Sequence, residues 1–333
     1  MDNLKYAHAV GRLRVLETRL LDKAKIDRMI ESLSPKEALK VLEETEYSSS
    51  LASIKRVEDY EFVLRDALKN LYKEIYSISP EKELVDVLCY KYDYHNIKVL
   101  IKSKILDKNF DNILIDAGSI SIELLRESIN EENYRDLSSN MREGIEKALK
   151  EFEEDKDPQK IDVILDKYMF SEMLFKASKL DNSFLLDYIK LNIDLTNIKT
   201  LIRVKKQEKS RNFFDEVIVD GGNLDRGALL ELLNETEENI SKKLYAKSYN
   251  TVVEKGLEEY LDSSKLSLME KLSDNFLMDY AKKAKFVSFG AEPIIAYILA
   301  KETEIKIIRI IMIGKLNNVS AEVIRERLRD IYV

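Results

Sequence analysis

The sequence predicts an all-α protein, and three observations support this fold class. The chain of 333 residues has only nine Gly, four Pro and no Trp, while 35% of its residues are charged, a composition typical of helices joined by few tight turns. Apolar residues recur at helical spacing in most segments. One short sequence pattern also occurs three times along the chain, which is typical of a repeat protein.

The first helices can be placed from their starting residues. A helix is expected over residues 4–20, with its apolar residues loosely on one side. Asp22 is a candidate N-cap for the next helix, because its carboxylate can accept hydrogen bonds from first-turn amides. Ser34 and Pro35 predict a further start, since the first helical position does not need the N–H that proline lacks.

A long helix is expected at about residues 54–77, and it has no counterpart later in the chain. Another helix should cover residues 81–108. Gly118 and the pair at 221–222 each precede a residue suited to N-capping, Ser121 and Asp225, so we expect turns there with glycine φ angles that can be positive. In the last part of the chain, Ser320 is expected to begin the final helix.

The repeated pattern is Leu-Asp followed seven residues later by Met, at Leu21–Met29, Leu165–Met173 and Leu261–Met269. A second block, residues 93–104, returns as residues 194–205 with Asp, Asn-Ile-Lys and a basic residue at matching places. Its third copy keeps little more than Glu304-Ile305-Lys306. These repeats predict three similar units over residues 1–130, 131–235 and 236–333, the first enlarged by the helix at 54–77.

The repeat positions favour structural roles. The three aspartates could converge on a cation, but we expect each to cap its own helix; they are Asp22, Asp166 and Asp262. The three methionines could line an adaptable groove, but we expect them in the core of each unit; they are Met29, Met173 and Met269.

Several classes of function are disfavoured by composition. The net charge of −7, with both signs interleaved, offers no basic field for nucleic acid. The chain lacks the phosphate-loop, dinucleotide and zinc motifs, so no cofactor and no metal are predicted. Cys89 and His95 point in opposed directions on one helix, which argues against a nucleophile pair. The first residues contain no apolar segment, so no secretory signal is expected. Charges interrupt the most apolar stretch, 294–313, so no membrane span is expected.

Basic residues in the repeated block form the candidate interaction surface. They could gather on one shared face, or they could be solvated flanks paired with nearby acidic residues; they are Lys98, Lys102, Lys199, Arg203, Lys306 and Arg309. The apolar residues of 305–313 surround their helix almost completely, so this helix should be buried on every side.

Several blocks of the sequence resemble those of a known protein family. The opening run Tyr6-Ala7-His8-Ala9-Val10-Gly11-Arg12-Leu13-Arg14, the blocks at 93–104 and 194–205 and the ending from Phe289-Gly290-Ala291-Glu292-Pro293 to Ile313 resemble the C subunit of bacterial and archaeal V/A-type ATPases. The chain is also similar to the d subunit of eukaryotic vacuolar ATPases. This resemblance covers the whole chain.

The resemblance implies three similar helical units around a pseudo-threefold axis, forming a funnel or socket. It implies a non-catalytic rotor component on the cytoplasmic face of the membrane, peripheral and without a span of its own. The implied partners are the D and F subunits of the central shaft and the membrane rotor ring, which is built from proteolipid subunits. The implied function is to pass torque for proton- or sodium-coupled ATP hydrolysis or synthesis.

Two other interpretations remain open. The units could stack without closing, as an α-helical repeat adaptor that binds another cytoplasmic protein along a groove. The chain could also be a helical enzyme that uses Asp22, Asp166 and Asp262 as acids or metal ligands, and replacing all three by Asn would test this.

Overall fold

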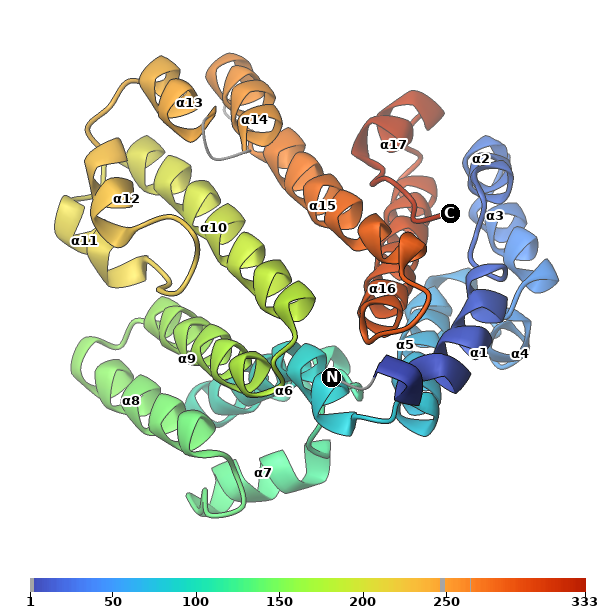
Figure 1. Ribbon diagram of the computed structural model, residues 1–333, viewed down its shortest axis with the longest axis horizontal. Coiled ribbons are helices and arrows are strands. Elements are labelled where there is room, and N and C mark those ends of the chain that lie inside the picture. The colour runs from blue at the N-terminus through green and yellow to red at the C-terminus, as the bar shows by residue number, and fades with distance from the viewer. Residues whose placement is uncertain (1–2, 246–248, 264) are drawn as a thin grey trace. The chain divides into compact units, whose positions relative to one another are not determined.

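The structure is a computed structural model that describes residues 3–245, 249–263 and 265–333, and every regular element in these ranges is helical (Figure 1). The all-α prediction is therefore confirmed for the described chain. None of the described helices combines the length and apolar character that crossing a membrane requires. The threefold funnel is not part of this finding and stays a prediction.

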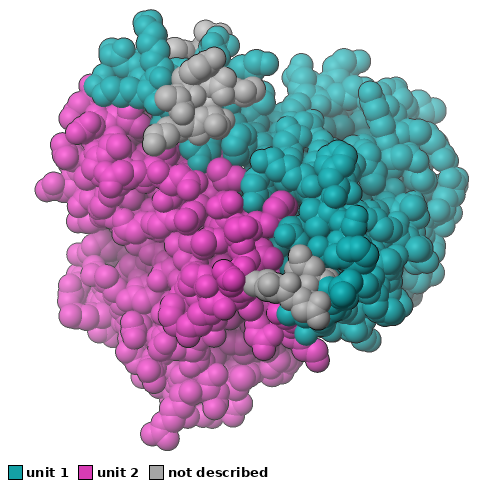
Figure 2. Space-filling model, in the orientation of Figure 1, with its two compact units in different colours: residues 1–80, 235–333 teal, residues 81–234 magenta. Residues whose placement is uncertain are grey.

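The chain packs as two compact units. Unit 1 contains residues 1–80 and 235–333, and unit 2 contains residues 81–234 (Figure 2). Unit 1 thus joins the two ends of the chain, which pack together although they are far apart in sequence. The predicted division into three units at residues 130 and 235 rests on sequence similarity, and it remains a prediction beside this division by packing.

Unit 1 is organised around one central helix, α16 (Glu292–Leu316), which packs against α1, α2, α3, α5, α15 and α17. The other α-helices of the unit are α1 (Ala7–Glu17), α2 (Lys23–Glu31), α3 (Pro35–Val41), α4 (Ser48–Leu51), α5 (Tyr60–Ile78), α13 (Glu237–Tyr245), α14 (Asn250–Ser263), α15 (Ser267–Lys282) and α17 (Ala321–Arg327). Its 3₁₀ turns are η1 (Asn3–Tyr6), η2 (Leu42–Glu44), η3 (Val57–Asp59) and η5 (Lys283–Phe286).

Burial of α16 follows from its composition. Most of its residues are buried on all sides of the helix, from Pro293 through Met312, as the nearly complete apolar circumference of residues 305–313 predicts. Each large apolar side chain removed from water stabilises the unit by roughly 1.5–3 kcal/mol. Ile313, near the C-terminal end, is the exception because 46% of it is exposed. Helix α16 therefore forms the core of unit 1.

Unit 2 is a set of long helices joined by short turns. Its elements are α6 (Lys82–Leu106), η4 (Asp111–Ile113), α7 (Ile122–Glu131), α8 (Ser139–Asp155), α9 (Pro158–Lys179), α10 (Ser183–Lys206), α11 (Arg211–Val217) and α12 (Arg226–Leu232). Helix α9 lies in the middle and packs against α6, α8 and α10. Accordingly α9 buries residues on several faces, including Leu165, Phe170 and Met173.

The predicted N-caps begin the predicted helices. The side chains of Ser34, Ser121, Asp225 and Ser320 each accept a hydrogen bond from an amide of the first turn, at 3.2, 3.2, 3.2 and 3.5 Å. Such caps satisfy amide donors that have no partner within the helix. The sequence thus located the starts of α3, α7, α12 and α17.

The repeated aspartates do not behave alike, which corrects one expectation. Asp22 caps α2, accepting from Lys25 N at 2.8 Å. Asp166 does not cap a helix, because α9 begins eight residues earlier at Pro158 with Asp157 as its N-cap. The side chain of Asp262 lies outside the described part of the chain.

The repeated methionines are all buried, as predicted. Met29, Met173 and Met269 are 0%, 3% and 0% exposed. Methionine suits such places because its flexible thioether fills irregular gaps between helices. The Met-lined groove, the alternative for these positions, is therefore not supported.

Candidate functional site

A carboxylate and an amide on α6 hold the loop that follows this helix. Asp93 accepts hydrogen bonds from Ser119 N at 3.0 Å, Ser119 Oγ at 2.6 Å and Ile120 N at 3.1 Å. Three residues along the helix, the Asn96 amide exchanges two bonds with Ile115, at 2.8 and 2.9 Å. Both side chains are fully buried, so these bonds form where unpaired polar groups would be costly.

Helix α10 repeats this arrangement 101 residues later. Asp194 accepts from Asn223 N and Leu224 N, each at 2.9 Å, and from Asn223 Nδ2 at 3.0 Å. Asn197 exchanges two bonds with Val219, at 2.7 and 2.9 Å. We name each arrangement a loop clamp, meaning an Asp and an Asn three residues apart on a buried helix that bind the backbone of the following loop. The sequence repeat therefore encodes a repeated tertiary contact.

Close approach, not backbone conformation, requires glycine in both clamps. A Cβ atom at Gly118 would lie 2.1 Å from Asp93 Oδ1, and one at Gly222 would lie 2.1 Å from Asp194 Oδ1. The positive φ expected in these turns occurs at Gly221, where φ is +96°, and not at Gly118 or Gly222. The expectation was wrong for these two because the carboxylate, rather than the turn, excludes a side chain.

The third copy of the block, on α16, has a different pair of polar residues. Lys301 and Glu304 stand where the first two copies have Asp and Asn. The Glu304 carboxylate accepts from the backbone N–H of Leu21, from the hydroxyl of Tyr47 at 2.7 Å and from the ammonium of Lys301. The same ammonium also contacts Glu46. Thus the polar pair still holds backbone from another segment, but it does so through a buried ion pair.

Burial shifts the ionisation of this cluster. Lys301 and Glu304 are 3% and 5% exposed. Burial lowers the pKa of Lys301, and the Glu304 carboxylate opposes that shift. Burial and the charge of Glu304 raise the pKa of Tyr47 well above its usual value, so this hydroxyl remains a donor. The Lys301 ammonium also lies 4.3 Å from the centre of the Tyr47 ring, which favours its charged form.

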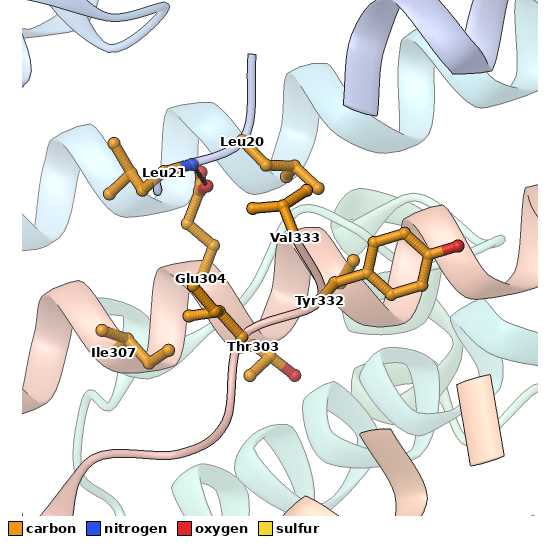
Figure 3. Close-up of a pocket in the computed structure, with 9 residues that line it drawn as sticks. Leu20, Leu21, Thr303, Glu304, Ile307, Tyr332 and Val333 are labelled. Atoms are coloured by element: carbon orange, nitrogen blue, oxygen red, sulfur yellow. Dashed lines mark hydrogen bonds between the residues drawn. The ribbon is translucent and has the colours of Figure 1, made fainter. Parts of the chain in front are cut away.

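A small cavity lies beside Glu304, closed by the C-terminal residues of the chain (Figure 3). Its volume is about 10 Å³, room for one water at most. In the figure the Glu304 carboxylate reaches the backbone nitrogen of Leu21, while Tyr332 and Val333 lie close by. The cavity is lined by Leu20, Leu21, Ala300, Thr303, Glu304, Ile307, Ile331, Tyr332 and Val333. Its size and lining residues indicate a packing contact between chain segments, not a ligand site.

The predicted basic surface consists of residues that already have acidic neighbours. Lys98 and Lys102 of α6 bind Asp166 and Asp162 of α9. On α16, Lys306 binds Asp274 of α15, and Arg309 binds Glu61 of α5 at 2.8 and 3.1 Å. Lys199 and Arg203 of α10 also make interactions. Local pairing, one of the two interpretations of these residues, is therefore found for at least four of the six.

The partners of these basic residues were not predicted. Asp166, expected as a cap, is the carboxylate that binds Lys98. Likewise the Asp and Asn of the clamps were visible in the sequence only as part of a repeated block. Their signal was a polar pair three residues apart, repeated inside a helix whose other residues are apolar. In the described part of the chain no group of three His, Cys, Asp or Glu side chains could hold a metal ion.

The chain is similar in sequence to a family of known proteins over most of its length. A family model described as "ATP synthase (C/AC39) subunit" matches residues 9–327. The chain is 30% identical to the C subunit of the V-type sodium ATPase of Enterococcus hirae over 330 residues, which cover 99% of each chain. It is 29% identical to the C subunit of the A-type ATP synthase of Methanocaldococcus jannaschii, over 98% of this chain and 87% of the relative. The corresponding protein of Methanobrevibacter smithii is 27% identical, over 95% and 85%.

Proposed function

This chain belongs to the ATP synthase (C/AC39) subunit family, and on that premise we propose that it is a non-catalytic rotor component that couples the central shaft to the membrane rotor ring. The shaft would consist of the D and F subunits, and the ring of proteolipid subunits. The observation that carries the proposal is the end-to-end correspondence with the C subunits of both V-type and A-type complexes. In this proposal the three repeated units form a socket around a pseudo-threefold axis on the cytoplasmic face.

Stiffness supports a role in transmitting torque. A coupler that yields under load would lose the work delivered to it, so its loops must not open easily. The loop clamps meet that need, because each fixes a loop to a buried helix through five hydrogen bonds. Hydrogen bonds to an ionised carboxylate contribute roughly 1.5–3 kcal/mol each. Loops held in this way move with their helices.

The six basic residues are the proposed shaft contacts, and the exposed fraction of each side chain separates the stronger candidates from the weaker ones. Lys98 and Lys102 are 19% and 28% exposed, whereas Lys306 and Arg309 are 44% and 40% exposed. All four would share their charge with the acidic residue that they already bind, so the net gain from each shaft contact is modest. We therefore propose that Lys306, Arg309 and the exposed Arg203 contribute more than Lys98 and Lys102 to binding an acidic shaft end.

Co-purification tests the coupling function directly. The experiment asks whether the chain bridges detergent-solubilised rotor ring and the D–F shaft under conditions in which neither binds the other. Recovery of ring and shaft together only when this chain is present supports the proposal. If the chain is added and the two components still separate, it does not perform the coupling.

Charge reversal tests the basic surface. We expect the triple substitution Lys98→Glu, Lys199→Glu and Lys306→Glu to weaken shaft affinity by at least tenfold, because each places a repulsive charge where an acidic partner would bind. Titration of the chain with the D–F complex measures this, and circular dichroism verifies the helical content. Lys242→Glu is the matched control, since Lys242 is a 68% exposed lysine in an i,i+4 ion pair outside this surface. Unchanged affinity of the triple variant would remove these residues from the shaft contact.

A further inference from the structure

The loop between α15 and α16 combines exposed aromatic side chains with a concentration of positive charge. We name residues 282–290 the lysine–phenylalanine loop; they contain Lys282, Lys283, Lys285, Phe286 and Phe289 and no acidic residue. Phe286 is 91% exposed and Phe289 is 50% exposed. Such exposure of large aromatic side chains on an acidic chain of net charge −7 indicates a surface that meets something else.

The backbone of this loop is held in place from α1. The Arg14 guanidinium donates to the carbonyl oxygens of Ala284 at 3.3 Å, Lys285 at 3.2 Å and Val287 at 2.9 Å. Arg14 is itself oriented by Glu17, whose carboxylate accepts from it at 2.9 Å. Phe286 lies between these anchored carbonyls, so its exposure belongs to a fixed loop conformation. Binding through a preorganised loop costs little ordering entropy.

Two of the three lysines of the loop meet aromatic rings. Lys283 Nζ lies 4.8 Å from the centre of the Tyr280 ring, and Lys285 Nζ lies 4.7 Å from that of Tyr332. The third, Lys282, forms an ion pair with Asp279 at 3.3 Å. An aromatic ring attracts an ammonium but does not cancel its charge. The loop therefore presents positive charge next to exposed phenylalanine.

We propose that the lysine–phenylalanine loop binds the surface of an anionic lipid membrane. Phe286 and Phe289 enter the boundary between headgroups and acyl chains, while Lys283 and Lys285 contact lipid phosphates. Lipid fits this loop because basic and aromatic side chains together are the combination that the membrane interface favours. The family of the chain consists of subunits of ATP synthases, so a membrane is a plausible neighbour of this loop. The lipid proposal does not depend on coupling to the shaft.

Vesicle flotation of the full chain tests the proposal. The vesicles contain phosphatidylcholine with roughly 30% phosphatidylserine, or phosphatidylcholine alone, at low ionic strength. We expect binding to the anionic vesicles only, decreasing as salt screens the lysines. Each lysine near an anionic surface changes binding about fivefold, so Lys283→Glu with Lys285→Glu should weaken it by at least about 25-fold. Phe286→Ser should weaken it roughly tenfold, from the loss of apolar burial.

A matched control separates this loop from any exposed phenylalanine. Phe175 of α9 is 53% exposed and has Lys179 Nζ 4.0 Å from the centre of its ring, but it lies within a helix and not in a loop. Phe175→Ser should bind anionic vesicles as the unchanged chain does. The proposal is overturned if the unchanged chain shows no preference for anionic vesicles, or if the loop variants float equally well. It is also overturned if Phe286→Ser abolishes capture by rotor ring in lipid-free detergent without changing flotation, because the loop would then be a protein contact.

Discussion

The loop clamp on α10 makes one prediction that is specific to its geometry. Gly222→Ala would place a methyl group 2.1 Å from Asp194 Oδ1, so the loop must move and the two amide bonds to this carboxylate must lengthen. Asp194→Ala removes the same two backbone bonds, from Asn223 N and Leu224 N, and also the bond from the Asn223 side-chain amide, by deleting the acceptor. Both single substitutions thus break one contact from opposite sides.

The magnitude follows from the two backbone bonds, because the exposed side chain of Asn223 can bond to water instead. An amide left without its charged acceptor costs about 1–3 kcal/mol, and water can reach this loop in part because Asn223 is exposed. We therefore expect each single substitution to lower the local opening free energy of the loop by about 2–3 kcal/mol. In the double variant the methyl group no longer meets a carboxylate, so the loss should stay near about 3 kcal/mol instead of doubling. The coupling between the two positions is then about 2 kcal/mol.

Amide hydrogen exchange of residues 218–226, followed by mass spectrometry, measures the opening of this loop directly. This measurement is preferable to global unfolding, because a chain of two compact units need not unfold in one step. Ile193 Cγ2 lies 3.1 Å from the same added Cβ, so a small residual cost should persist in the double variant. Additive losses, or an alanine at position 222 that leaves exchange unchanged, would refute the close-approach argument.

Two further predictions concern buried ionisable groups. Glu304→Gln should destabilise unit 1 by about 3–5 kcal/mol, because it leaves the buried Lys301 ammonium with the partly exposed Glu46 as its remaining carboxylate. Amide hydrogen exchange of α16, followed by mass spectrometry, measures this. Glu238→Gln, which removes only a surface ion pair, should be near neutral. For Asp93, burial raises the pKa to about 6 from 3.8. Between these two pH values the folded state binds more protons than the unfolded chain. The free energy of unfolding should therefore rise as pH falls from about 7 to about 4, by about 3 kcal/mol at most. Asp93→Asn should flatten that part of the pH profile, and an identical profile in the variant would assign the pH dependence to other groups.

Local signals were sufficient for much of the fold. Ser34, Ser121, Asp225 and Ser320 begin their helices because a side-chain oxygen beside the first turn is a local requirement, independent of the remainder of the chain. The burial of Met29 was predictable from helical periodicity for a similar reason. Asp166 was mistaken for a cap because its neighbours match those of Asp22, and only the observation that α9 begins at Pro158 separates the two.

The candidate site was only partly predictable. Its basic residues were found from their place in a repeated block, but their partners lie on other helices, such as Asp274 for Lys306 and Glu61 for Arg309. The clamps were visible as a repeated polar pair, yet the loops they bind follow 19–30 residues later in the chain. Which backbone a buried carboxylate meets depends on how the helices pack, and periodicity does not contain that information.

The sequence by itself determined the helical class, the starts of α2, α3, α7, α12 and α17, the repeat and the resemblance to an ATPase subunit family, because these depend on neighbours three or four residues away or on the order of blocks. Only the tertiary structure decided that both ends of the chain share unit 1, that Lys301 and Glu304 replace a clamp by a buried ion pair, and that Gly118 and Gly222 face carboxylates. These features arise from contacts between distant segments, whose free energy exists only once packing has excluded water from both partners.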